Sequence, residues 1–527
     1  MSKNKNELVL TEAERFILNT VKKHTQYSME DLQNRQALLE EELGIDSIIL
    51  GSILHDLTQA FGASGVVSAQ GFSTLDGLLQ AFSAFSLKVE LSTQQAEKAQ
   101  CSGNQFVAEK TMKNFMSDGS SDPFSKVYKF SSFLKEKTQS GHFWYGMASH
   151  SACDNRVRLF DEYAGCEREF LMFASNNYLG MANDPRVIEA ICEATKLYGA
   201  TNTGCRLIGG TNHLHLELES KLADLKGREA CIVFPSGYSA NLGVISALLG
   251  PNDTVITDVY NHMSIQDGCK LSGAKRKIFK HNDMHSLETV LRQVSESGGG
   301  KLIVADGVFS MHGDIVQLPE LLKLAKKYQA RVLIDDAHST GVLGKKGSGT
   351  AEYFDQKGAV DIEIGTMSKA LAGMGGFAVA DAELVDYLRY YANSYVFAAT
   401  IPAGVAAGLI KSIDLMQQEP ERIQQLWANI HYFKSSLNKL GFNTEHSESA
   451  IIPVVIGDET KAMEMGRSIR QRGMFCQTVV FPGVAVGDAR LRISILSTHT
   501  RKDLDQAIEI LLESAYENKL FIQQESA

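Results

Sequence analysis

The sequence of 527 residues lacks the features of several common protein classes. Its eight cysteines are scattered and form no C-x-x-C pair, which argues against a zinc site and against a disulfide framework. Its formal net charge is −10, whereas a nucleic-acid-binding protein needs positive charge to neutralise phosphates. We therefore expect reduced thiols, no metal site and no nucleic-acid partner.

Long apolar segments are also missing. The first ten residues, MSKNKNELVL, have no apolar core of the kind found in signal peptides. The longest weakly polar run, AATIPAGVAAGLI at 398–410, is too short to span a bilayer and is broken by Gly and Pro. GGGKL at 298–302 is not a P-loop, because Ser295 stands where the first Gly belongs and Leu302 replaces Ser or Thr. We expect a soluble, cytoplasmic protein.

The length and the distribution of charge indicate several domains. A chain of 527 residues exceeds one ordinary hydrophobic core, and its hydrophobic content of 44% is that of a globular protein. Residues 1–90 carry 12 acidic and 7 basic residues, a net charge of −5. An acidic module of this kind attracts a basic partner surface. We predict a helical domain at 1–90, a linker at 91–125, a large domain at 126–420 and a small domain at 421–527.

The periodicity of apolar residues changes along the chain. Helical spacing occurs at 8–25, 47–61 and 73–85, whereas 91–125 is rich in Ser, Gln, Lys and Asp. After the linker, short β-branched runs alternate with helical stretches, which predicts a mostly parallel α/β sheet. Beyond about 420 the pattern becomes α+β. The predicted strands are EACIVF (229–234), DTVITDV (253–259), KRKIFKH (275–281), KLIVADGVF (301–309), RVLIDDA (331–337), DIEIGTM (361–367) and GGFAVA (375–380).

Chemically capable side chains follow these predicted strands, at the sheet edge where ligands bind in α/β proteins. Each has an ordinary explanation by itself, such as a helix cap for an Asp or a solvated side chain for a Lys. Together they supply what pyridoxal phosphate (PLP) needs: a lysine, a carboxylate for the ring nitrogen and a helix start for the phosphate. The residues are Gly237, Tyr238, His262, Ser310, Asp335, His338, Thr366 and Lys369.

The motifs around these residues resemble those of a known family, the α-oxoamine synthases of PLP fold type I. Its members include 8-amino-7-oxononanoate synthase and serine palmitoyltransferase. The resemblance covers about 130–527 and implies a large domain with a mostly parallel seven-stranded sheet and a small α+β C-terminal domain. The motifs, in the family's order, are FASNNYLG (173–180), GCRLIGGT (204–211), FPSGYSAN (234–241), HMSIQDG (262–268), DGVFSMHGD (306–314), DDAHSTGVLG (335–344), GTMSKALAGMGG (365–376) and ARLRIS (489–494).

The resemblance implies a role for each residue around the cofactor ring. Lys369 would form the Schiff base with PLP and remove the Cα proton of the amino acid. His262 would stack on the pyridine ring, and Asp335 would pair with its nitrogen. His338 and Ser310 would lie near the phenolic oxygen of the ring.

The resemblance also implies how the phosphate and the substrate are bound. The backbone amides of Gly237 and Tyr238, with Thr366, would face the phosphate. Asn176 and Arg492 would bind the substrate, with Arg492 gripping its carboxylate through a forked guanidinium. Members of the family act as homodimers with the active site between subunits.

One motif departs from the family pattern. The family often has a Ser-Thr or Ser-Asn pair after an aromatic residue, where it reaches the phosphate of the neighbouring subunit. This chain has Phe397-Ala398-Ala399-Thr400, so two side-chain contacts are lost and only Thr400 offers a replacement.

The stretch GIDSI at 44–48 resembles the site where acyl carrier proteins receive their phosphopantetheine arm. Ser47 follows Asp46 at the start of a predicted helix and would carry the arm covalently. Helix 47–61 has only Asp56 where acyl carriers show several acids, so a degenerate helical dimerisation module is the alternative. A carrier implies two further partners, a phosphopantetheinyl transferase and an acyl-loading enzyme.

The combined resemblance predicts a decarboxylating condensation of a small amino acid (Gly, Ala or Ser) with an acyl thioester presented by the fused carrier. The products would be an α-aminoketone, CO₂ and the free carrier thiol. One alternative is an acyl-CoA-using enzyme with a vestigial N-terminal module. A second is a non-catalytic scaffold, which would commonly lose the lysine that this chain keeps as Lys369.

Overall fold

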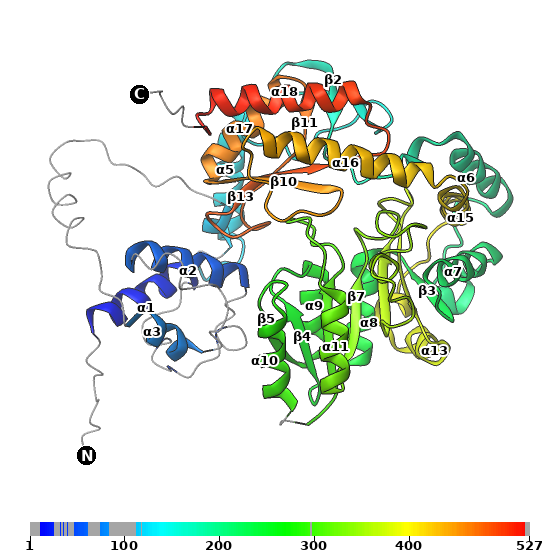
Figure 1. Cartoon of the computed structure of the whole chain (residues 1–527), viewed down its shortest axis with the longest axis horizontal. Helices are drawn as coiled ribbons and strands as arrows, with labels where there is room; N and C mark the ends of the chain where they lie inside the picture. The colour runs from blue at the N-terminus through cyan, green and yellow to red at the C-terminus, as the bar shows by residue number, and fades with distance from the viewer. Residues whose placement is uncertain are drawn as a thin grey trace. The chain divides into compact units, whose positions relative to one another are not determined.

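The computed structural model places the chain in two compact units (Figure 1). The first unit comprises residues 1–144, 456–462 and 479–490, and the second comprises 145–455, 463–478 and 491–527. The structure describes residues 11–25, 32, 35, 39, 47–61, 74–83, 112–116, 119–295 and 298–521.

Three helices of the first unit share one apolar core. They are α1 (Glu12–Thr25), α2 (Ser47–Phe61) and α3 (Leu75–Ser83). Apolar residues recur every three or four positions in each helix, so one face of each can be buried against the other two. The core residues include Ile17, Val21, Ile53, Leu57, Leu75, Leu78 and Phe82.

The predicted linker contains a short ordered element at its end. Residues 91–111, 117 and 118 of this segment lie outside the described residues. The short 3₁₀ helix η3 (Met112–Phe115) precedes α5 (Ser125–Gln139), and the two are joined by aromatic packing. The ring of Phe115 lies 4.9 Å from that of Phe133, measured between centroids.

The second unit is built on a seven-stranded sheet with the order β3-β9-β8-β7-β6-β4-β5. Figure 1 labels β3, β4, β5 and β7 of this sheet. The neighbours from β8 to β5 are parallel, and β9 runs antiparallel to both β3 and β8. The prediction of a mostly parallel sheet of seven strands is therefore confirmed. The strands are β3 (Ala230–Phe234), β4 (Thr254–Asp258), β5 (Lys275–Phe279), β6 (Lys301–Asp306), β7 (Arg331–Asp335), β8 (Ile362–Thr366) and β9 (Gly376–Ala380).

Both faces of the sheet are buried, which explains why its strands are continuous apolar runs rather than alternating ones. Leu302 and Val304 of β6 face one apolar cluster, and Ile303 and Ala305 face the other. One cluster includes residues of α8, α9 and α13, and the other includes residues of α10 and α11. These helices are α8 (Gly237–Leu248), α9 (Met263–Ser272), α10 (Met284–Ser295), α11 (Leu318–Tyr328) and α13 (Ala382–Tyr391).

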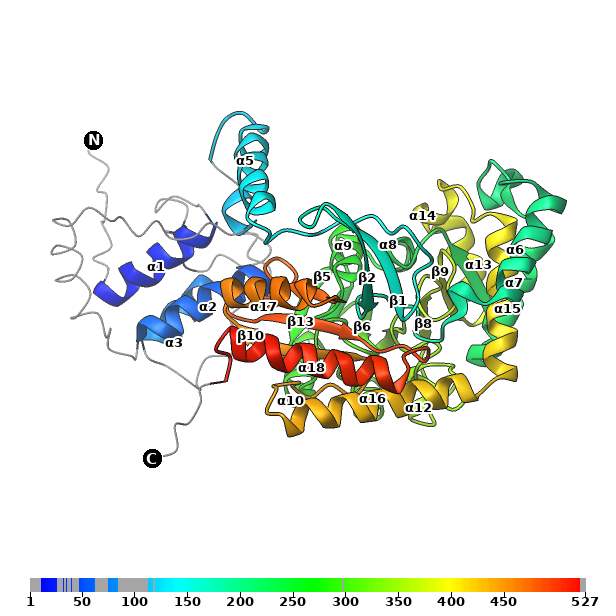
Figure 2. The same cartoon turned by 90° about the horizontal axis from the view of Figure 1, so that it is seen from above.

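The remaining strands and helices precede or follow the strands of the large sheet in the sequence, except α12, which lies between β7 and β8. The strands are β1 (Arg156–Asp161), β2 (Cys166–Met172), β10 (Ile451–Gly457), β11 (Met474–Phe475), β12 (Gln477–Val479) and β13 (Ala489–Ser494). The helices are η4 (Met181–Asn183), α6 (Pro185–Tyr198), η5 (Arg206–Gly210), α7 (His213–Lys226), α12 (Thr350–Tyr353), α14 (Asn393–Val396), α15 (Ala403–Gln418), α16 (Glu421–Lys439), α17 (Glu459–Gln471) and α18 (Arg501–Glu517). Figure 2 shows α16 and α18 side by side. Among the described residues, no helix is long and apolar enough to cross a membrane.

Candidate active site

A cavity of about 230 Å³ lies at the carboxyl ends of β4, β6, β7 and β8 and at the start of α8. Parallel strands deliver the residues that follow them to one edge of the sheet, which is where the sequence predicts a site. All eight predicted PLP-binding residues line this cavity. Its lining is Ser236, Gly237, Tyr238, Asn241, His262, Ser264, Asp306, Val308, Ser310, Asp335, Ala337, His338, Thr366, Ser368 and Lys369.

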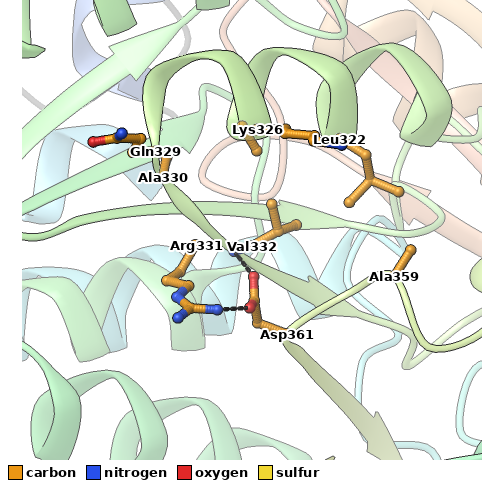
Figure 3. Close-up of a pocket in the computed structure, with 9 residues that line it drawn as sticks. Leu322, Lys326, Gln329, Ala330, Arg331, Val332, Ala359 and Asp361 are labelled. Atoms are coloured by element: carbon orange, nitrogen blue, oxygen red, sulfur yellow. Dashed lines mark hydrogen bonds and ion pairs between the residues drawn. The ribbon is translucent and has the colours of Figure 1, made fainter.

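A second cavity, of about 370 Å³, lies at the opposite edge, where β7 begins (Figure 3). Its lining has no His, Cys, Ser or Thr. The carboxylate of Asp361 already accepts hydrogen bonds from the Arg331 guanidinium at 2.6 Å and the Val332 N–H at 2.8 Å. Because Arg331 is mostly exposed, this pair is an ordinary surface interaction. We assign no chemistry to this cavity.

Lys369 has the properties of a nucleophilic lysine. It stands three residues after β8 and lines the first cavity. Burial lowers its pKa to about 7, helped by the charge of Arg492 and opposed by the charges of Asp335 and Asp306. About half of the amine is therefore neutral near pH 7, and only the neutral amine attacks a carbonyl or accepts a proton.

Asp335 is held rigidly at the end of β7. Its Oδ2 accepts a hydrogen bond from Asn241 Nδ2 at 2.6 Å, and its Oδ1 accepts one from the Ala337 N–H at 2.9 Å. Asp306 is its register partner on β6, and burial raises the pKa of Asp306 well above its usual range, with the charge of Asp335 adding to the effect. The two hydrogen bonds therefore fix the Asp335 carboxylate in an orientation suited to a positively charged ring nitrogen.

His262 is the N-cap of α9 and is fixed by the residues around it. Its Nδ1 lies 2.7 Å from the Ser264 hydroxyl, and its backbone N–H donates to the Asp306 carboxylate at 3.2 Å. The ring lines the cavity and is exposed towards it. A flat ring anchored in this way can cover one face of a planar ligand.

His338 is a neutral imidazole tied to a buried tyrosine. Burial lowers its pKa well below the usual range, and the charges of Lys369 and Arg492 act in the same direction. Its Nδ1 lies 2.8 Å from the hydroxyl of Tyr178, which itself donates to Asn176 Oδ1 at 3.1 Å. The imidazole therefore keeps a hydrogen-bonding nitrogen for a ligand oxygen without carrying charge.

The start of α8 offers a cradle for an anion. Ser236 and Ser239 form a capping box with each other, at 3.0 and 2.9 Å, and Gly237 and Tyr238 line the cavity between them. A Cβ on Gly237 would lie 3.0 Å from the Cβ of Thr366, which is tighter than ordinary contacts, so glycine helps β8 pack close to the start of α8. The first N–H groups of a helix, with its positive dipole end, bind phosphate.

Arg492 and Asn176 contact each other but do not line the cavity. Arg492 Nη2 is 3.4 Å from Asn176 Oδ1, and Arg492 Nε donates to the Ser310 carbonyl at 2.6 Å. Arg492 is buried on β13, and its charge acts on both Lys369 and His338. The two predicted substrate residues are thus joined to the cavity wall through Ser310 and Tyr178.

Two other predicted features are not among the residues that line the cavity. The departure from the family pattern is at 397–400, where Thr400 donates its N–H to the Gly204 carbonyl at 3.2 Å and Phe397 is 83% exposed. Helix α2 begins at Ser47, but the side chain of Ser47 and the whole of Asp46 lie outside the described residues.

Four residues of the site had no role in the sequence interpretation: Tyr178, Asn241, Ser264 and Asp306. All four lie inside the motifs that carry the family resemblance. Asn241 and Asp306 could have been identified from the sequence, because each is a polar residue among apolar strand or helix positions. Such a residue is buried when the chain folds and then needs a hydrogen-bond partner.

The cavity fits PLP in each of its parts. Lys369 can bind the aldehyde carbon, Asp335 the ring nitrogen, and the α8 N-terminus the phosphate, where Gly237 leaves the space that a Cβ would fill. His262 and His338 suit the ring face and the phenolic oxygen. The donor set is thus that of a PLP site.

Comparison with known proteins agrees with this geometry. The family model for aminotransferases of class I and II matches residues 168–511. The chain is 62% identical over 408 residues to 4-hydroxy-2,2'-bipyrrole-5-methanol synthase PigH of Serratia sp. (strain ATCC 39006), which covers 77% of this chain and 62% of that protein. The chain therefore spans about three fifths of the length of this relative.

For two further relatives, the match extends over a larger share of the relative's own length. The 8-amino-7-oxononanoate synthase of Symbiobacterium thermophilum is 46% identical over 341 residues, 65% of this chain and 87% of that enzyme. A solved structure of serine palmitoyltransferase (SPT) with PLP superposes with a TM-score of 0.72 at 32% identity, covering 76% of this chain and all of that one. The chain therefore belongs to the aminotransferase class I and II family, among its PLP-dependent acyltransferases.

Proposed function

We propose that the protein catalyses the PLP-dependent, decarboxylating condensation of L-serine with an acyl thioester carried on a phosphopantetheine arm at Ser47. The products are an α-aminoketone, CO₂ and the free carrier thiol. The observation that carries the proposal is the joint placement of Lys369, Asp335, His262 and His338 around one cavity beside the α8 N-terminus.

The residues that line the cavity and those next to it have different roles in the proposed reaction. Bound PLP supplies the electron sink for negative charge that develops at the substrate Cα. Lys369, with its pKa of about 7, takes the Cα proton near neutral pH, when roughly half of its amine is free. Arg492 and Asn176 hold the substrate carboxylate, and His338 offers a hydrogen-bonding nitrogen without adding charge.

The choice of serine is supported by the names of two of the three relatives, PigH and serine palmitoyltransferase. Serine palmitoyltransferase is named for serine. The PigH product carries a methanol substituent, which is a hydroxymethyl group, and among glycine, alanine and serine only serine brings that group on its Cα. We therefore favour serine over the other two amino acids that the sequence left open.

The acyl partner is proposed to be delivered by the N-terminal helices. We keep the predicted boundaries, with a carrier domain at 1–90, a linker at 91–125, a PLP-binding domain at 126–420 and a small domain at 421–527. The net charge of −5 on 1–90 and the start of α2 at Ser47 support a carrier. A covalent tether raises the local carrier concentration to roughly millimolar, which favours delivery within the same assembly.

The synthase part is proposed to act as a homodimer. Its described surface exposes large apolar side chains that a monomer would have to keep in water: Ile208 is 91% exposed, Phe397 83% and Leu197 77%. We take these side chains as part of the subunit interface that the dimer proposal requires. A phosphopantetheinyl transferase and an acyl-loading enzyme complete the proposed partners.

The test uses the full-length protein loaded with PLP. A phosphopantetheinyl transferase and a series of acyl-CoA thioesters, from acetyl to palmitoyl, would charge Ser47, and serine, glycine and alanine labelled in the carboxyl carbon would be offered in turn. We expect labelled CO₂ from serine and an aminoketone of matching mass. Release of CO₂ from glycine or alanine in preference to serine would refute the choice of serine.

The second candidate is an acyl-CoA-using synthase with a vestigial N-terminal module. The identity of 46% to 8-amino-7-oxononanoate synthase favours it. It predicts efficient turnover of free acyl-CoA by a protein that carries no modification at Ser47, whereas the carrier proposal predicts that this turnover is slow. The non-catalytic scaffold that the sequence left open is not favoured, because the chain belongs among PLP-dependent acyltransferases.

A further inference from the structure

A partly buried imidazole cation stands between two carboxylates outside the cavity. His281 Nδ1 lies 3.0 Å from Asp258 Oδ1, and His281 Nε2 lies 2.9 Å from Asp314 Oδ2. Burial alone would lower the pKa of His281, but its hydrogen bonds to the two carboxylates, and their charges, raise it to about 10. With an acceptor at each nitrogen, the ring donates from both sides and is oriented by both.

The three residues belong to three neighbouring strands at the cavity edge. Asp258 ends β4, His281 lies two residues after β5, and Asp314 lies in the turn after β6. Asn282 strengthens the junction: its N–H donates to Asp258 Oδ2 at 2.8 Å and its Nδ2 to Asp314 Oδ2 at 3.2 Å. The ion cluster thus fixes the turn after β6 relative to the edge of the sheet.

That turn determines where the Ser310 carbonyl points. Phe309 donates its N–H to the Asp314 carbonyl at 3.1 Å, and Gly313 donates to the Phe309 carbonyl at 2.8 Å. Gly313 has a φ of 76°, and a Cβ there would lie 2.1 Å from the Ile451 carbonyl oxygen, so the turn has little freedom. Ser310 lies within this closed turn.

The Ser310 carbonyl is a principal partner of Arg492. It accepts from Arg492 Nε at 2.6 Å, which is shorter than the contacts of Arg492 Nη1 with Ser494 at 3.2 Å and Gln477 at 3.3 Å. A guanidinium is planar, so fixing Nε fixes the plane in which both Nη atoms lie. The Ser310 carbonyl therefore sets the direction in which Arg492 offers its remaining N–H groups.

We propose that Asp258, His281 and Asp314 are positioning residues that orient Arg492 towards the substrate carboxylate through the Ser310 carbonyl. The proposal rests on the function proposed above for Arg492. A triad that served stability alone would leave substrate binding unchanged once the protein is folded and loaded with PLP. Outer partners of this kind commonly change the affinity of a site about 10- to 100-fold.

The test compares two small molecules on the PLP-loaded, full-length protein. Serine has the carboxylate that Arg492 would bind, and ethanolamine lacks it. Calorimetry and the change in PLP absorbance both report binding. His281→Gln, which cannot donate at both ends, should weaken serine binding about 10-fold or more and leave ethanolamine and PLP binding unchanged. His285→Gln, at an exposed position on α10, is the matched control and should change neither.

A double-mutant cycle with Arg492→Lys separates the possible outcomes. If His281 acts through Arg492, adding His281→Gln to Arg492→Lys should cost no further serine affinity. Asp314→Asn keeps the shape of its site and provides an independent variant with the same expected result. Additive losses in the double variant would overturn the positioning role of the triad but not the proposed function of Arg492. Serine binding by both triad variants within twofold of wild type would have the same consequence. Unchanged serine binding by Arg492→Lys would overturn the carboxylate site and the triad with it.

Discussion

The buried lysine at the end of α7 provides a test of how charge stabilises the large sheet. Lys226 Nζ lies 2.6 Å from Asp336 Oδ2 and 3.2 Å from Glu363 Oε2, and all three side chains are at most 1% exposed. Burial alone would lower the pKa of Lys226, but the two carboxylates raise it, so the lysine is charged. Lys226→Met would remove the cation that contacts both carboxylates and leave the two carboxylates in the core.

Removing one partner of a buried ion pair costs about 3–5 kcal/mol. Burial already raises the pKa of Glu363, so this carboxyl can take up a proton in the variant and reduce the loss. We therefore expect a cost near the lower limit, about 3 kcal/mol. For a fold of several hundred residues this lowers the melting temperature by roughly 5 °C.

The assay is thermal unfolding of the PLP-loaded protein, followed by circular dichroism at one scan rate. Lys221→Met is the matched control, because Lys221 lies on the same helix and forms a partly exposed ion pair with Asp414 at 2.6 Å. Exposed pairs contribute at most about 1 kcal/mol. Equal shifts for the two variants would refute the argument that burial makes the Lys226 cluster important.

Three further predictions concern the cavity and the assembly. Lys369→Ala should leave the fold intact but bind PLP without a covalent bond. Measurement of the intact mass after borohydride reduction checks this, and a covalent adduct would refute the assignment of Lys369. Because burial lowers the pKa of Lys369 to about 7, the rate of PLP attachment to the apo-protein should rise with pH to a midpoint near 7 and then level off, whereas a midpoint near 10 would contradict that pKa. Light scattering at micromolar concentration should show an active dimer, and an active monomer would refute the dimer proposal.

The sheet and the set of cavity residues could be predicted because both depend on local sequence. A strand buried on both faces must be an apolar run, and β3 at Ala230–Phe234 falls within the predicted run at 229–234. Residues directly after such strands must meet at one edge. The positions of Asp335 and Lys369 directly after predicted strands were therefore enough to predict that the two residues lie close together.

The contacts that orient these residues were not predictable in the same way. Tyr178 and His338 are 160 residues apart, and Asn241 and Asp335 are 94 apart, so only the folded chain shows that they pair. The Lys226 cluster and the His281 triad are harder still to predict from the sequence. Single charged residues in a sequence look like solvated side chains, and only the structure shows which are buried together.

The most direct test of the proposed reaction is a comparison of wild type with Ser47→Ala, after treatment of both with a phosphopantetheinyl transferase and an acyl-CoA. Intact mass locates the arm, and release of labelled CO₂ from carboxyl-labelled serine measures the condensation. We expect wild type to gain the acyl-pantetheine mass at Ser47 and to release CO₂, and Ser47→Ala to gain no mass and release none, while its binding of serine is unchanged. Equal CO₂ release by both proteins, or an arm on another residue, would contradict the carrier-fed reaction.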